Sequence, residues 1–290
     1  MSSVKILTLK GDDIPEKLRN IPDAPKLLYA RGEADLNDLM TRPIVAIVGS
    51  RKVDSYGIHA TRMLAHDLAS QGIIVASGMA LGTDAIAHRA CLEAGTPSIA
   101  VLASGIENLT PKTNHDIAMK ILRTGVILSE KSGDYSPHEY DFLIRNRLIS
   151  GLSAGVIVTQ AAARSGSLNT ARHALEQGRV VMAVPGPITN PLCEGPNNLL
   201  KMGAVPVTCA DDVLKALNIV VPDKSEKDYE LLAGNEQELL IIRKMQDGTT
   251  DGELLAQQTG LSAQEFNVHL TMLEIRGIIM PLGANHWTLQ

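Results

Sequence analysis

"IVAIVGSRKVDSYG", residues 44–57, begins with five consecutive β-forming residues and passes through Gly49-Ser50-Arg51 into a segment with helical periodicity. A buried strand that turns directly into a helix is typical of an α/β protein with a parallel sheet. Many nucleotide-binding chains have the spaced glycines G-x-G-x-x-G at this turn and no charge. Arg51 stands in this turn instead, and its ligand is the question that the sequence raises.

The alternation of short apolar runs with amphipathic segments continues beyond this stretch. It predicts strands at 44–48, 73–76, 98–103, 126–129, 155–159 and 179–184, with a weak one near 204–207. Helices are predicted between them, near 56–70, 83–94, 113–124, 138–152, 167–177 and 195–202. Residues 44–217 are therefore expected to form an extended Rossmann-like domain, a doubly wound and mostly parallel α/β sheet.

The flanking segments have different compositions. Residues 1–43 contain four prolines, and we expect an extended lead-in with a short helix or two that packs on the Rossmann-like domain. Residues 218–234 mix proline with alternating charge, which indicates a linker. Three helical patterns and two β-like runs joined by Gly-Ala follow. They predict a small winged-helix domain over residues 235–290.

Charge and cysteine content restrict the class of protein. The net charge is −5, but residues 1–215 carry 22 Lys/Arg and 21 Asp/Glu, whereas residues 216–290 carry 5 and 11. Any polyanion site should therefore be a local cluster on the large domain. The three distant cysteines fit neither a disulfide framework nor a zinc site, and the histidines lack metal-ligand spacing. No signal-peptide pattern and no long apolar run is present, so we expect a cytoplasmic protein without membrane contact.

Small residues follow several of the predicted strands at their carboxyl ends, where open α/β sheets bind ligands. These segments are GSR at 49–51, SGMALGTDAIAH at 77–88, RSGSLNTA at 164–171 and Pro185-Gly186. Small side chains let a ligand approach the backbone, and free N–H groups at helix starts favour an anion. The loops therefore predict a phosphate-binding rim. Because the dinucleotide fingerprint and the P-loop are both missing, we expect no cofactor, and the planar fork of Arg51 suits two phosphate oxygens.

A second basic cluster lies in SPHEYDFLIRNRLISGLS, residues 136–153. A helix is expected to start here, with Ser136 as its N-cap residue. Phe142, Arg145 and Asn146 share one stripe of that helix, and a ring beside a guanidinium group suits base stacking combined with phosphate contact. Arg147 projects about 200° away from Arg145, so a structural role is the alternative to DNA binding for this residue.

Simpler interpretations of these residues stay open on the sequence alone. Arg51 also fits a surface or dimer salt bridge, and Phe142 fits a core position. Asp84 fits a first-turn acid of a helix, and His88 fits a packed, hydrogen-bonded side chain. The sequence contains no convincing catalytic set, so we expect a protein that is not an enzyme.

Together and in order, these motifs resemble the DprA/Smf family of DNA-processing proteins. The matching segments are IVGSR, SGMALGTDAIAH, RNRLISGLSAGVIV, SGSLNTARHALEQGR, VPGP and EGPNNLLKMGA. The resemblance implies a non-catalytic homodimer that binds single-stranded DNA without sequence preference, protects it, and loads the RecA recombinase in natural transformation. The DNA-binding residues that it implies are Gly49, Ser50, Arg51, Gly78, Phe142, Arg145, Asn146, Arg147, Ser165, Gly166 and Ser167.

Two positions depart from the family pattern. Thr110-Pro111 stands where Tyr-Pro is common, and Gln160 stands where Glu is common, so the resemblance implies no role for these positions. One alternative is a nucleotide hydrolase similar to the lysine-decarboxylase-like phosphoribohydrolases, although RSGSLNTA lacks the doubled glycine and the nearby Glu of their P-G-G-x-G-T-x-x-E segment. Another is a duplex-DNA regulator, but residues 235–290 have a net charge of −4, which favours a protein-contact module.

Overall fold

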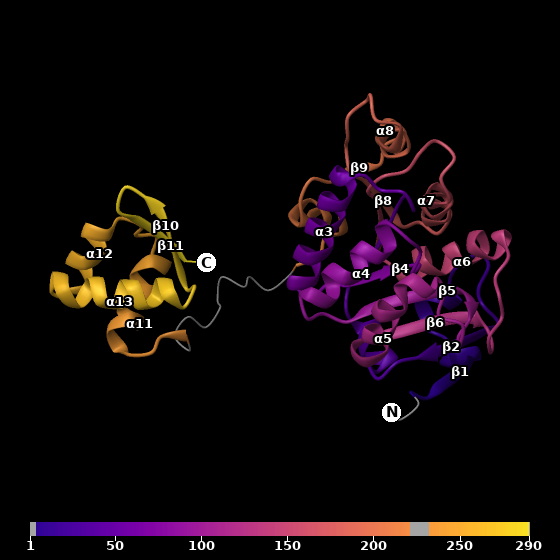
Figure 1. Ribbon diagram of the computed structural model, residues 1–290, viewed down its shortest axis with the longest axis horizontal. Coiled ribbons are helices and arrows are strands. Elements are labelled where there is room, and N and C mark those ends of the chain that lie inside the picture. The colour runs from indigo at the N-terminus through magenta and orange to yellow at the C-terminus, as the bar shows by residue number, and fades with distance from the viewer. Residues whose placement is uncertain (1–3, 221–231, 290) are drawn as a thin grey trace. The chain divides into compact units, whose positions relative to one another are not determined.

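The computed structural model describes residues 4–220 and 232–289, which belong to two separate compact units (Figure 1). Most of the linker predicted at 218–234 lies outside the described residues. Within these two ranges, no helix has both the length and the apolar character needed to cross a bilayer.

The first unit is built on a nine-stranded sheet with the order β1-β2-β6-β5-β4-β3-β7-β8-β9. Strands β3 to β9 run parallel, while β2 is antiparallel to both β1 and β6. The strands are β1 (Ile6–Lys10), β2 (Leu27–Arg31), β3 (Ile44–Val48), β4 (Ile74–Ser77), β5 (Ser98–Gly105), β6 (Val126–Lys131), β7 (Gly155–Val158), β8 (Val180–Ala183) and β9 (Val205–Pro206). The predicted α/β fold with a mostly parallel sheet is confirmed.

Helices alternate with these strands and cover both faces of the sheet (Figure 1). They are α1 (Glu16–Arg19), α2 (Leu36–Thr41), α3 (Ser55–Ser70), α4 (Thr83–Glu93), α5 (His115–Thr124), α6 (Glu139–Leu152), α7 (Gly166–Glu176), α8 (Glu194–Lys201) and α9 (Ala210–Leu217). Apolar side chains of α3, α4 and α9 pack on one face, and those of α1, α6 and α7 pack on the other. The central strand β3 is buried along its whole length because both of its faces are covered.

The strand order reverses between β3 and β7. From β3 the chain adds β4, β5 and β6 on one side, and after α6 it returns to add β7, β8 and β9 on the other side. Such a switch point opens a crevice at the carboxyl ends of the two strands, where open α/β sheets hold their ligands. Gly49-Ser50-Arg51 follows β3 directly and so lies at this point.

The structure corrects three local expectations. The lead-in contributes two strands, β1 and β2, to the sheet and is more than an extended segment with short helices. Helix α9 was not predicted. Helix α6 is capped at His138 and not at Ser136, because the carboxylate of Asp141 accepts the backbone N–H of His138 at 2.8 Å.

The second unit has three helices and a two-stranded antiparallel hairpin: α11 (Glu236–Gln246), α12 (Gly252–Thr259), α13 (Ala263–Ile275), β10 (Ile279–Gly283) and β11 (His286–Leu289). Ile241, Leu255, Phe266 and Leu273 are buried in its own apolar core. Each helix begins at a side-chain cap, supplied by Asn235, Asp251 and Ser262.

Candidate nucleic-acid interface

Arg51 is exposed at the carboxyl end of β3, and its side chain lies against helix α6. Its guanidinium carbon is 5.0 Å from the centroid of the Phe142 ring, within the range of a cation–π contact. Within residues 4–220 and 232–289, its guanidinium group forms no hydrogen bond and no ion pair. The N–H fork of Arg51 is therefore available to a ligand.

The loop that carries Arg51 is clamped between the end of β7 and the start of α4. The backbone N–H of Ser50 donates to the carbonyl of Gln160 at 2.6 Å, and the carbonyl of Ser50 accepts the N–H of Thr83 at 3.1 Å. A side chain at Gly49 would collide with Thr83, and one at Gly82, whose φ is +74°, would collide with the Ser50 carbonyl. Gly49 and Ser50 thus fix the position of Arg51 through the backbone.

Arg145 lies beneath the Phe142 ring and is buried. Its guanidinium donates to the carbonyl of Gly78 at 2.7 Å and to that of Val101, and its central carbon is 5.9 Å from the ring centroid. Burial lowers the pKa of Arg145 to about 10, although the Asp84 carboxylate opposes this change. Arg145 is therefore a positioning residue that supports the ring and the loops around it.

Gly78 permits this arrangement, because a Cβ atom there would lie 2.7 Å from both Nη2 of Arg145 and Oδ2 of Asp84. The Asp84 carboxylate accepts the backbone N–H groups of Gly78 and Ala80, each at 3.1 Å. Burial raises the pKa of Asp84, against the effect of Arg145 and these N–H groups. No substitution of Gly78 fits between these two side chains without a shift.

His88, on the second turn of α4, is fully buried, and its Nδ1 is 2.7 Å from the hydroxyl of Ser98. Burial lowers the pKa of His88 to about 3, so the imidazole is neutral at physiological pH. His88 is a packed structural residue.

Helix α7 begins beside α6 at the same edge of the sheet. The Asn146 side chain donates to the carbonyl of Gly166 at 3.2 Å, which joins the two helices. Ser165 is the N-cap residue of α7, and its hydroxyl is 2.8 Å from that of Ser167. The structure therefore brings Ser165, Gly166 and Ser167 next to the helix that carries Phe142.

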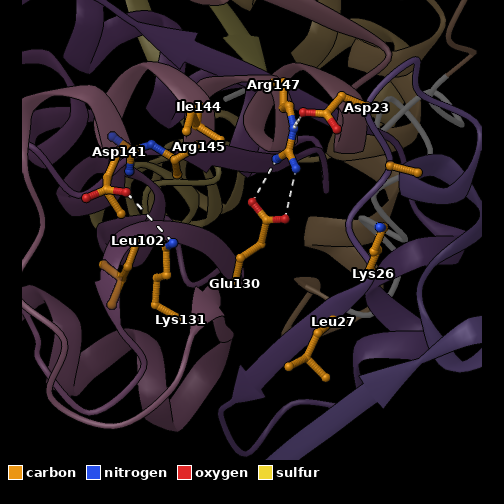
Figure 2. A pocket seen from close by; sticks show the side chains of 12 residues that line it. Asp23, Lys26, Leu27, Leu102, Glu130, Lys131, Asp141, Ile144, Arg145 and Arg147 are labelled. Atoms are coloured by element: carbon orange, nitrogen blue, oxygen red, sulfur yellow. Dashed lines mark hydrogen bonds and ion pairs between the residues drawn. The ribbon is translucent and has the colours of Figure 1, made fainter.

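Arg147 points away from this group. Its Nη1 and Nη2 atoms each donate to Glu130 at 2.8 Å, and its Nε donates to Asp23 at 2.8 Å (Figure 2). Burial would lower the pKa of Arg147, but hydrogen bonds and charge attraction with Glu130 and Asp23 raise it. The structure thus separates Arg147 from the other predicted binding residues and engages its guanidinium in ion pairs.

Sequence reasoning missed two features of this edge. Gln160 donates from Nε2 to Oδ1 of Asp54, the N-cap of α3, at 2.8 Å, and so supports the helix that follows Arg51. Lys131, the last residue of β6, has its Nζ 5.1 Å from the centroid of the Tyr135 ring. Its position at the carboxyl end of a strand, where ligands bind, was the available signal. In the described part of the chain, no three His, Cys, Asp or Glu side chains are grouped to hold a metal ion.

Solved structures with the same architecture include two from DNA-processing proteins. The X-ray structure of DprA from Streptococcus pneumoniae matches with a TM-score of 0.68 and 37% identity, and the match covers 74% of each chain. The structure of DprA from Helicobacter pylori, which gave insights into the unique single-stranded DNA binding mode of that protein, matches with a TM-score of 0.66 and 33% identity, over 75% of this chain and 98% of that one.

Sequence comparison agrees with the structural one. Protein Smf of Escherichia coli is 38% identical over 285 residues, which are 95% of this chain and 75% of that protein. DprA of Streptococcus pneumoniae is 40% identical over 207 residues, which are 71% of this chain and 72% of that protein. The family model described as DNA recombination-mediator protein A matches residues 5–218. The chain therefore belongs to the DNA recombination-mediator protein A family.

Proposed function

We propose that this chain binds single-stranded DNA, without sequence preference, at the carboxyl edge of its sheet. The observation that carries the proposal is the free guanidinium of Arg51, which lies at the strand-order switch point and 5.0 Å from the Phe142 ring. Arg51 would hold a backbone phosphate, while the guanidinium plane and the ring offer a stacking surface for bases. The Helicobacter pylori relative, which binds single-stranded DNA, supports this ligand.

Family membership supports a role as a recombination mediator. We propose that the protein works as a cytoplasmic homodimer in natural transformation, shields the incoming strand, and helps to load the RecA recombinase. Binding alone fulfils this role, so the proposal includes no bond-breaking step and no catalytic residue. Gly49, Ser50, Gly78, Arg145 and Asn146 would shape the site, and Ser165 to Ser167 would line its far side.

The second unit is proposed to be a winged helix that contacts protein. Its three helices followed by a hairpin have the element order of that fold. Helix α13, in the place of a recognition helix, exposes Val268, Met272 and Ile275. Residues 235–290 carry a net charge of −4. Proteins that bind duplex DNA gain much of their affinity by neutralising phosphates, so this charge favours a protein partner.

A salt titration with oligo-dT tests the role of Arg51. For single strands, the logarithm of affinity falls with the logarithm of salt concentration by about 0.7 per phosphate neutralised. Arg51→Ala should weaken binding and reduce this slope by about that amount. Arg123→Ala is the matched control, because Arg123 is an exposed arginine near the end of α5, at the opposite edge of the sheet. An unchanged affinity and slope for Arg51→Ala would remove it from the site.

One further comparison separates the proposed function from its alternatives. The wild-type protein should prefer oligo-dT to a duplex and to mononucleotides. Release of free base from a nucleoside monophosphate would instead support the hydrolase, and a strong preference for duplex would support the regulator.

A further inference from the structure

A cavity of about 340 Å³ lies along the same carboxyl edge, outside the ends of β5 and β6 (Figure 2). The sheet lines it with Leu102, Glu130 and Lys131, and α6 contributes Asp141 and Ile144. The remaining side is closed by Asp23, Ala24, Lys26 and Leu27. Its volume lies in the range of small-ligand pockets, about 300–1,000 Å³. It is separate from the Arg51 loop, which lies outside β3 and β4. Two of the predicted site residues, Arg145 and Arg147, also line it.

A second cation–ring pair stands beside this cavity. Lys131 lies 5.1 Å from the Tyr135 ring centroid, a geometry close to that of Arg51 and Phe142 at 5.0 Å. Aromatic residues make up only 3% of the chain. Of the five aromatic residues in the described part of the first unit, four follow the carboxyl end of a strand, namely Tyr56, Tyr135, Tyr140 and Phe142. Rings and cations gathered on one edge are what a single-strand track requires.

The charges in the cavity favour a base over a phosphate. Arg147 neutralises Glu130 and Asp23, as described above. Oδ2 of Asp141 accepts the N–H of His138 and the hydroxyl of Tyr135, each at 2.8 Å, whereas Oδ1 forms an ion pair with Lys131 at 3.9 Å, which is too long for a hydrogen bond. Oδ1 of Asp141 thus retains capacity to accept a hydrogen bond. A carboxylate repels phosphate but accepts a hydrogen bond from the exocyclic amino group of a base.

We propose that this cavity is a second nucleotide subsite for the same strand, which takes a base with an exocyclic amino group read by Asp141. Lys131 and Lys26, which lie on either side of the Glu130–Arg147 ion pair in Figure 2, contact the adjoining sugar-phosphate. The proposal rests on the proposed function, because it adds a contact to the strand that Arg51 holds, and it confines the lack of sequence preference to the Arg51 site. β3 and β6 are three strand spacings apart, about 14 Å, so a strand that follows the carboxyl edge reaches both sites.

The test compares oligo-dC with oligo-dT of equal length, because cytosine has the amino group and thymine lacks it. Wild-type protein should bind oligo-dC about fivefold more tightly, the lower end of the discrimination that a specific base contact gives. Ala24→Phe fills the cavity without changing charge and should abolish this preference. Lys131→Met should lower the salt slope by about 0.7 for both oligonucleotides. Lys120→Met, an exposed lysine on α5, is the matched control and should change neither quantity.

Two outcomes would overturn the subsite. One is equal wild-type affinity for the two oligonucleotides, and the other is a wild-type salt slope in Lys131→Met. If Arg51→Ala still weakens binding in either case, the proposed function stands and only the proposed subsite is refuted. If the wild-type protein binds neither oligonucleotide, the proposed function itself falls. Urea unfolding shows whether Ala24→Phe is misfolded. If it is, the base preference of the wild type and the salt slope of Lys131→Met decide whether the subsite exists.

Discussion

Gln160 shows how one amide can organise a binding loop. Its Nε2 donates to Oδ1 of Asp54, and its backbone carbonyl accepts the N–H of Ser50. The N–H of Gly57 is the main cause of the lowered pKa of Asp54, with smaller contributions from Asn190 and Gln160. The carboxylate therefore stabilises the fold above its unfolded pKa, and this contribution is lost as the pH falls through its lower folded pKa. The side-chain amide of Gln160 can donate a hydrogen bond to this ionised carboxylate.

Gln160→Glu should destabilise the protein, because it brings a second carboxylate to the Asp54 carboxylate in a buried position. We expect a loss of about 2 kcal/mol in the free energy of unfolding at pH 7, measured by urea denaturation. The loss should shrink toward pH 5, since one of two close carboxyl groups acquires a raised pKa and takes up a proton. The double variant Asp54→Asn/Gln160→Glu should recover most of the stability. A double variant as unstable as the single one would contradict this pairing.

His88 gives the fold a pH dependence of its own. Its pKa is about 3 in the folded protein because of burial, and about 6.5 when unfolded. Between these values the unfolded chain binds more protons, so stability rises with pH and is lost as pH falls through this window. His88→Asn should remove about 2 kcal/mol of the stability difference between pH 6.5 and pH 5 in urea titrations. The exposed His59→Asn should keep the wild-type dependence, and an equal change in both variants would refute this origin.

Helix α6 joins the lead-in, the sheet and the binding edge. Arg147→Met leaves Glu130, whose side chain is 22% exposed, without its partner, and should lower the free energy of unfolding by about 3 kcal/mol. Asp23→Asn removes a 77% exposed carboxylate from the same arginine and should cost less than about 1 kcal/mol. Urea denaturation compares the two, and hydrogen exchange should show faster exchange in β1 and β2 for Arg147→Met. Equal losses would contradict this ranking.

The elements differ in how far the sequence predicted them. β3 to β8 were predicted within one or two residues, because parallel strands covered on both faces are continuous apolar runs. β1 was missed because it lies at the sheet edge and is only partly buried. β2 follows Pro25, and its partner β6 lies almost a hundred residues later, a pairing that no local pattern reveals.

The same limit applies to the candidate site. The structure places the Arg51 loop against the Phe142 helix, because the carboxyl ends of parallel strands share one edge. The separate placement of Arg145 and Arg147 depends on Val101, Glu130 and Asp23, which are distant in sequence. Helical angle alone suggested a different role for Arg147, but it did not identify the carboxylates.

At the scale of the whole chain, charge is divided between the two units. Residues 1–220 have a net charge of +1, whereas the complete chain has −5. Truncation after residue 220 should therefore leave single-strand affinity equal or slightly higher at low salt, because it removes acidic repulsion without touching the first unit's core. Fluorescence anisotropy with oligo-dT checks this. A tenfold loss of affinity would show that the second unit contributes to binding.

The reversed direction of β2 has a consequence for how this fold can diversify. Because β2 runs against its neighbour β6, it begins, and does not end, beside the ligand-binding edge. Extra residues inserted between α1 and β2 would lie at the mouth of the cavity and alter which ligands enter it. The same insertion between β2 and α2 would emerge at the remote side and leave recognition unchanged. One inverted strand thus makes two adjacent loops unequal targets for evolution and for engineering.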